Sequence, residues 1–232
     1  MKQGGAALLP PLSLSSAQVA FTGRAEGDMG HGGGRVETVR ADVAERRRAV
    51  VDLPWTWLRQ VHGTEVVRVD EPGGAAGARA DAAVTDRPGC ALAVLTADCA
   101  PVALASPEGV IGVAHAGWRG VAAGVVEATV AEMRALGATE LSAAIGPCIR
   151  PGCYEFGPAE LDEVAARLGE SVRATTTGGR PALDLPRAVR GALVRAGVDD
   201  VDDAGTCTAC SAQHFSWRAR KEQQRQAAVI WR

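Results

Sequence analysis

The residues with the clearest chemical potential in this sequence are His62, Cys99 and His115. Two imidazoles and a thiolate are typical zinc ligands, and three protein ligands leave a fourth position for water or substrate. The trio therefore predicts a metal site that is open for catalysis and not a closed structural one. The alternative interpretation is that Cys99 is a small buried apolar residue and that both histidines are ordinary loop residues.

A predicted hairpin brings two of these side chains to one end of a sheet. The sequence Ser-Pro-Glu-Gly before Val110 is typical of a tight turn. Pairing Ala105 with Val110 across this turn places His115 opposite Ala100, and Cys99 follows one residue further along. A shift of one residue in the register would change this geometry. His62 lies just before another predicted strand and would close the third side of the site.

The other predicted elements indicate an α+β fold in one domain, 1–232, with residues 1–18 as a flexible N-terminal extension. Strands come in groups and helices mostly follow them, which favours a sandwich over strict βαβ alternation. The C-terminus is predicted to form a hairpin. The predicted strands are 64–70, 81–85, 90–97, 101–105, 110–115, 141–145, 215–218 and 227–231; the predicted helices are 36–51, 121–136, 158–168 and 186–196.

Composition excludes several classes of protein. The net charge of −2 argues against nucleic acid as a partner, and no apolar segment reaches the roughly 18–20 residues that a membrane helix needs. No signal peptide is expected, and six sparse cysteines favour a reducing compartment, so we expect a cytoplasmic protein. Four histidines are too few for a multicopper site. A monomer is consistent with the sequence.

Several motifs, taken together and in order, resemble the YfiH/YlmD family. This family was first named for polyphenol oxidase or laccase domains and was later described as purine nucleoside phosphorylases. The motifs are QVHG (60–63), DAAVT (81–85), LTADCAPV (95–102), AHAGWRG (114–120), IGPCI (145–149) and HFSWR (214–218).

The resemblance implies a fold, a metal and a reaction. The fold is a layered α-β-β-α sandwich of mixed sheets flanked by helices, like the catalytic domain of the cytotoxic necrotizing factors. The ligands of one zinc ion per chain are His62, Cys99 and His115. The substrates are phosphate and the purine nucleosides adenosine, inosine, guanosine and methylthioadenosine, with adenosine deamination as a second activity. The sequence departs from the family at 27–35, where glycines and a histidine replace an Asn-Leu-Gly motif.

The chemistry requires a proton carrier and cationic groups besides the metal ligands. Asp98 and Asp81 are the candidate proton carriers. The alternative role of Asp98 is that of a hydrogen-bonding aspartate at a strand end, and the favoured role of Asp81 is to cap a turn. Phosphate binding needs arginines or helix N-termini, and Arg119 precedes a predicted helix. The candidate phosphate or substrate contacts are Arg119, Arg24 and Arg59.

Other functions remain open at this stage. Cys99 and His115 without metal would suit a cysteine-type amide hydrolase that edits cell-wall precursors. A copper-dependent, laccase-like polyphenol oxidoreductase would need a redox metal at this site, and a non-enzymatic protein would keep the pocket only to bind a small molecule. A competing zinc site combines Cys207, Cys210 and His214 in a C-x2-C-x3-H pattern, with Cys148 or Cys153 as the fourth ligand.

Overall fold

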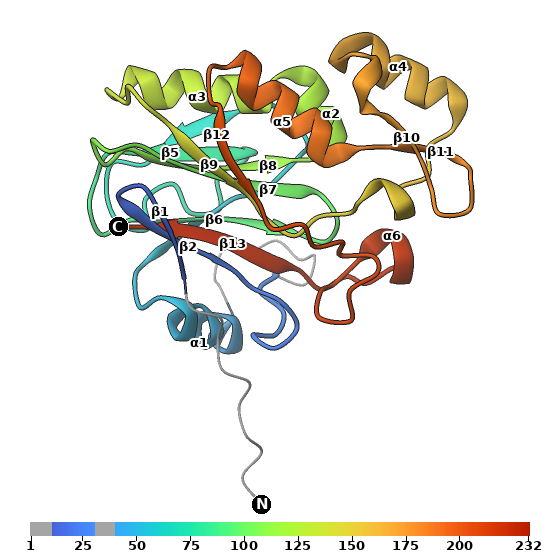
Figure 1. Cartoon of the computed structure of the whole chain (residues 1–232). Coiled ribbons are helices and arrows are strands. Elements are labelled where there is room, and N and C mark those ends of the chain that lie inside the picture. Colours follow the sequence, from blue (N-terminus) through green and yellow to red (C-terminus); the bar gives the residue numbers. More distant parts are fainter. Residues whose placement is uncertain (1–10, 31–39) are drawn as a thin grey trace, which may run out of the picture.

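The computed structural model describes residues 11–30 and 40–232 and arranges them in four layers (Figure 1). Two mixed sheets pack face to face, helices α2–α5 cover one outer face, and α1 (Ala41–Val50) covers the other. The first sheet has the order β1 (Leu12–Leu14), β2 (Ala17–Phe21), β13 (Gln226–Trp231), β6 (Ala91–Thr96), β3 (Trp55–Trp57). The second has the order β12 (Asp200–Asp203), β9 (Ser142–Ile145), β7 (Ala100–Ala105), β8 (Ile111–Ala116), β5 (Ala82–Thr85), β4 (Val66–Arg68).

Two small strands complete the outer layer formed by α2–α5. A separate pair, β10 and β11, lies beside α4 (Figure 1). The bounds of the remaining elements are Trp118–Ala123 (α2), Val125–Ala135 (α3), Pro158–Leu168 (α4), Arg173–Thr175 (β10), Pro181–Leu183 (β11), Leu185–Arg195 (α5) and Trp217–Arg220 (α6). Two 3₁₀ turns lie at Pro151–Cys153 and Glu170–Val172.

Alternating apolar residues build the layers. On β7, Val102 and Leu104 pack under the helices, whereas Ala103 and Ala105 pack between the sheets. A third apolar cluster lies on the outer face of the first sheet, beneath α1. Because successive strand side chains point to opposite faces, a sheet covered on both sides requires the continuous apolar segments seen in the sequence. The expected α-β-β-α sandwich is confirmed.

The β7–β8 hairpin has a register one residue away from the predicted one. His115 pairs with Pro101, not with Ala100. The ladder extends to Ser106, which bonds to Val110 through both its backbone N–H and its hydroxyl. The loop is therefore 107–109, and Gly109 takes the positive φ that closes this hairpin type.

The observed register brings Cys99 and His115 closer together than the predicted one. Side chains alternate along β7, so Cys99 and Pro101 point to the same face. Because Pro101 is the partner of His115, Cys99 becomes a diagonal neighbour of His115 on that face. The predicted register would have directed the two side chains to opposite faces.

The predicted helix 121–136 is two helices, α2 and α3, and starts earlier than expected. Gly124 adopts a φ of +99° between them, a backbone conformation that ends one helix and changes the direction of the next. Gly117 is the N-cap of α2, so that this short helix begins at Trp118, three residues after His115.

Two predictions at the termini are wrong. The C-terminus is not a hairpin: α6 replaces the strand predicted at 215–218, and β13 pairs instead with β2 and β6. The flexible extension predicted at 1–18 includes β1, which pairs with β2 in the first sheet. Residues 1–10 lie outside the described part. Local sequence patterns do not reveal such pairing between chain ends, which is decided by tertiary packing.

Within the described residues, no helix combines the length and apolar character that crossing a bilayer requires.

Candidate metal centre and active site

His62, Cys99 and His115 converge at one end of the sandwich. Their ligand atoms all lie within 4.8 Å of one another, and the two imidazole rings meet edge to face with their centroids 4.7 Å apart. Cys99 lies where the chain crosses from β6 in the first sheet to β7 in the second, and His62 lies on the similar crossing from β3 to β4. Three segments distant in sequence therefore present one ligand set.

Asp81 positions two of the three side chains. Its fully buried carboxylate accepts a hydrogen bond from His115 Nδ1 at 2.8 Å. It also accepts hydrogen bonds from the backbone N–H groups of Val61, His62 and Gly63 at 2.8–3.2 Å. Asp81 therefore caps the loop that carries His62, which is distant in sequence. The contact with His115 leaves Nε2 of that ring for a metal, a carboxylate–histidine pairing common behind zinc ligands.

The His62 loop is held on its other side by Gln60. The Gln60 side chain donates to the backbone oxygen of Leu95 at 2.7 Å and accepts its N–H at 2.8 Å, as a neighbouring strand would. Gly117 leaves the space that the His62 ring occupies, because a Cβ there would lie 2.5 Å from His62 Nδ1 and 3.1 Å from Cys99 Sγ. These contacts fix a loop in which His62 itself has a φ of +59°.

The protonation states of Cys99 and His115 are strongly coupled. Burial raises the pKa of Cys99, but the charge of His115 and hydrogen bonds from His115 and His62 outweigh it and lower that pKa to about 6. Burial lowers the pKa of His115, but the Cys99 thiolate and Asp81 raise it to about 9. Without metal, the neutral-pH form is therefore a thiolate–imidazolium pair.

Three hydrogen bonds fix the carboxylate of Asp98 in place. One carboxylate oxygen accepts hydrogen bonds from the hydroxyls of Thr208 and Ser216, each at 2.7 Å. The other accepts a hydrogen bond from the backbone N–H of Arg218 at 2.6 Å. Its φ of +107° reorients the chain just before Cys99. The alternative reading of Asp98 as a hydrogen-bonding strand-end residue matches this geometry, and its role as proton carrier stays a prediction.

The three predicted arginine contacts differ in their surroundings. Arg24 is paired with Glu222 and lies over the ring of Phe215. Arg59 is exposed and donates to the carbonyl of Gly77 at 2.9 Å. Arg119 is exposed, its guanidinium lies 4.3 Å from the Trp118 ring centroid, and it forms no ion pair with any residue that the structure describes.

Two residues that sequence reasoning did not single out lie near the trio. Burial and the charges of Cys99 and Asp98 raise the pKa of Tyr154, while the charges of Arg218 and Arg119 oppose this rise. The guanidinium of Arg218 lies 4.8 Å from the Tyr154 ring centroid. The motif HFSWR contains Arg218, but no local signal distinguishes this arginine from the many others in the chain.

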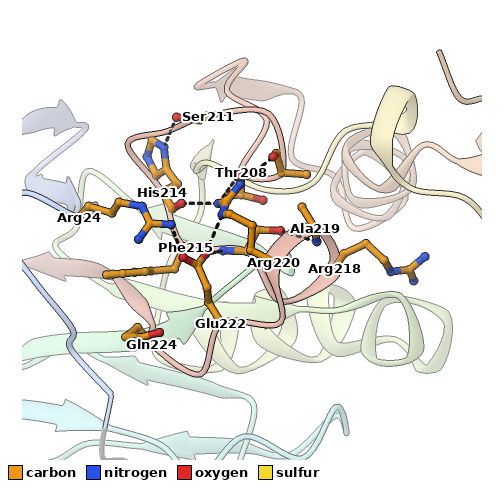
Figure 2. Close-up of polar contacts among 12 residues, drawn as sticks. Arg24, Thr208, Ser211, His214, Phe215, Arg218, Ala219, Arg220, Glu222 and Gln224 are labelled. Carbon is orange, nitrogen blue, oxygen red and sulfur yellow. Dashed lines mark hydrogen bonds and ion pairs between the residues drawn. The ribbon is translucent and has the colours of Figure 1, made fainter.

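The C-terminal segment that carries Arg218 is itself tightly bound (Figure 2). Arg220 donates to the carbonyls of Thr208 and His214 at 3.2 and 2.6 Å. Glu222 bridges Arg220 and Arg24. This network joins the loop after β2 to the C-terminal loop, which bonds to Asp98 beside Cys99.

Comparison with known proteins gives consistent matches. The family model described as multi-copper polyphenol oxidoreductase laccase matches residues 24–232. A Streptomyces griseus protein named purine nucleoside phosphorylase is 40% identical over 93% of this chain and 94% of its own length. One with the same name from Streptomyces coelicolor is 42% identical over 84% of this chain and 81% of its own.

Solved structures show the same architecture. A Neisseria meningitidis protein superposes with a TM-score of 0.82 at 29% identity, covering 97% of this chain and 98% of that chain. YlmD from Geobacillus stearothermophilus superposes with a TM-score of 0.78 at 32% identity, covering 93% of this chain and 91% of that chain.

Proposed function

This chain belongs to the YfiH/YlmD family of laccase-domain proteins, and from this we propose that it is a zinc-dependent purine nucleoside phosphorylase. Relatives at 40–42% identity carry the phosphorylase name and support an enzyme. The observation that carries the proposal is the convergence of His62, Cys99 and His115 at one end of the sandwich.

The donor set favours zinc over copper. One thiolate and two imidazoles suit Zn²⁺ and leave a position open, and the Asp81–His115 pair supplies the carboxylate partner that zinc-binding histidines commonly have. When bound, zinc would supply Lewis-acid polarisation of an oxygen atom. A laccase-type cluster would need more imidazoles than the four histidines of this chain provide.

Phosphorolysis replaces the bond between the base and C1′ of the ribose by a bond from a phosphate oxygen. The base leaves with the electron pair and takes up a proton, and ribose 1-phosphate is formed. Positive charge develops at the sugar, so the chain must hold a phosphate dianion beside it. We assign this task to Arg119, which has no acidic partner among the described residues, and to Arg218, because the charges of both arginines act on Tyr154. Arg24 and Arg59 are the more distant substrate contacts of the proposal.

Product analysis tests this function. Zinc-loaded protein given inosine is expected to release hypoxanthine and ribose 1-phosphate only when phosphate is present. Adenosine, guanosine and methylthioadenosine are tested in parallel, and ammonia release from adenosine measures the proposed deaminase activity. Absence of base release from every nucleoside would contradict the proposal.

Arg119→Gln tests the phosphate contact. Loss of one charge-assisted contact of about 1.5–3 kcal/mol corresponds to a KM for phosphate that is about 10- to 100-fold higher. The KM for the nucleoside should change much less. Arg48→Gln, at an exposed arginine on α1, which covers the opposite outer face, is the matched control. Equal effects of the two substitutions on the KM for phosphate would argue against the assignment.

A cysteine-type amide hydrolase is the second candidate, because Cys99, His115 and Asp81 also form a thiolate–imidazolium–carboxylate series. His62→Ala separates the two functions. A zinc enzyme loses a ligand and its activity, whereas a cysteine hydrolase keeps its nucleophile and its base.

A further inference from the structure

Three further cysteines form a second cluster, which the proposed function does not use. The sulfur atoms of Cys153, Cys207 and Cys210 all lie within 4.8 Å of one another, and those of Cys153 and Cys210 are 2.9 Å apart. Cys153 ends the 3₁₀ turn Pro151–Cys153, while the other two lie in the loop after β12. All three are free thiols.

Two of the three sulfur atoms come from one tight turn. Cys207 and Cys210 flank the C-x2-C segment, and the backbone N–H of Ser211 donates to the carbonyl of Cys207 at 3.0 Å. The turn brings both sulfur atoms into the same cluster, and Cys153 joins them from the segment 151–153.

The two segments that carry the cluster are joined independently of these thiols. Cys148 and Cys207 form an isolated parallel bridge, with backbone bonds from Cys148 to Thr206 and from Thr208 to Cys148. Arg220 holds the same turn through the carbonyls of Thr208 and Ala209 (Figure 2). The three sulfur atoms therefore meet on a backbone that is already positioned, which lowers the entropic cost of binding an ion.

We propose that Cys153, Cys207 and Cys210 form a second metal site that binds a thiophilic d¹⁰ ion, Zn²⁺, with a water molecule as the fourth ligand. Zinc–sulfur bonds of about 2.3 Å in a tetrahedron separate sulfur atoms by about 3.8 Å, and small rotations of the side chains reach this spacing from the observed one. Cys210 is exposed, so water can reach the open position.

This ligand set differs from the C-x2-C-x3-H pattern considered from the sequence. His214 is not part of the cluster, and its Nδ1 is hydrogen-bonded to the Ser211 hydroxyl at 2.9 Å. Cys148 is buried, and its sulfur atom is not part of the cluster. The third protein ligand is therefore Cys153.

Zinc at this site would clamp the C-terminal loop close to the first site. Thr208, inside the C-x2-C turn, and Ser216, further along the loop, both bond to Asp98, the residue before Cys99. The ion would thus connect the segment 148–153 to the loop that positions Arg218. This link between two segments is independent of the reaction proposed for the first site.

Metal content and thermal unfolding test the second site. Under thiol reductant and after dialysis, wild-type protein should retain two equivalents of zinc, and Cys210→Ser should retain one and unfold at a lower temperature. Cys99→Ala should also retain one, because it removes only the first site. Cys90→Ala, at a buried thiol outside both clusters, is the control and should retain two.

Cobalt substitution provides a readout that does not depend on variant stability. In Cys99→Ala, the remaining Co²⁺ should show the intense thiolate-to-cobalt absorption of several sulfur ligands, and Cys153→Ser should weaken it. A single zinc equivalent in wild type that Cys210→Ser leaves unchanged would overturn the second site. A Cys153–Cys210 disulfide that persists under reductant would overturn it too. Neither result depends on whether nucleosides are cleaved.

Discussion

Replacing Cys99 by alanine is expected to remove the ion of the first site and to lower kcat for base release by about 10³-fold or more. Loss of metal polarisation costs several kcal/mol of transition-state stabilisation, and each 1.36 kcal/mol is a factor of ten in rate. The measurements are zinc content and phosphate-dependent release of hypoxanthine from inosine. Cys90→Ala should retain both its zinc and most of its activity. Full activity of Cys99→Ala would refute the metal assignment.

The same site predicts how metal affinity depends on pH. Ligation requires thiolate and neutral imidazole, and without metal the pKa of Cys99 is lowered to about 6 while that of His115 is raised to about 9. Between about pH 6 and pH 9, metal binding displaces one proton, from His115, so the affinity for the metal should rise about tenfold per pH unit. Below about pH 6 a second proton must leave Cys99, and the dependence becomes steeper. Competition with a chelator from pH 5 to 9 measures this slope, and a flat profile would contradict the coupling.

Asp81→Asn is expected to weaken metal binding by about 10- to 100-fold, because loss of a carboxylate behind a ligating histidine has effects of this size. The amide retains one acceptor oxygen, but its NH₂ group faces backbone N–H groups of the His62 loop. The variant should therefore also be less stable, by about 1–3 kcal/mol. Zinc titration and urea unfolding measure the two effects, and Asp70→Asn, at an exposed position, is the control.

The stability effect at Asp81 should itself depend on pH. Burial raises the pKa of Asp81, but the hydrogen bond from His115 and those from backbone N–H groups outweigh it and lower that pKa. A group with a lowered folded-state pKa stabilises the fold above its unfolded value, about 3.9, and loses this contribution as pH falls toward the folded value. The stability difference between wild type and Asp81→Asn should therefore shrink below about pH 4. A difference that grows with acidity would contradict this role.

Much of the framework was predictable because it depends on local patterns. The apolar segment 90–97 predicts a strand covered on both faces, and β6 is buried between the second sheet and the layer beneath α1. Helices α4 and α5 lie where prolines in the first turn and glycines after the last residue place them. The grouping of strands, with most helices after them, predicted the α+β class for the same reason.

Prediction failed where distant segments compete for the same partner. The polar segment before β13 resembles a hairpin loop, but β13 gains more by pairing with both β2 and β6 than with residues 215–218. The observed register of the β7–β8 hairpin differs from the predicted one by one residue, because Ser106 forms two hydrogen bonds with the backbone of Val110. The sequence of the turn alone does not reveal these hydrogen bonds. For Asp98, the role of proton carrier stays a prediction, but only the fold shows that three groups from the C-terminal loop bond to its carboxylate.

The sequence by itself determined the residue types of the candidate site, the family and the alternation that builds the layers. Tertiary structure decided which thiols and imidazoles meet. His62, Cys99 and His115 lie on different segments, and they converge because two chain crossings between sheets end beside β8. The fold likewise brings Cys153 together with Cys207 and Cys210, whereas His214 is hydrogen-bonded to Ser211. Ligand chemistry is a property of single residues, whereas distances of a few ångströms between remote segments arise only when the whole core packs.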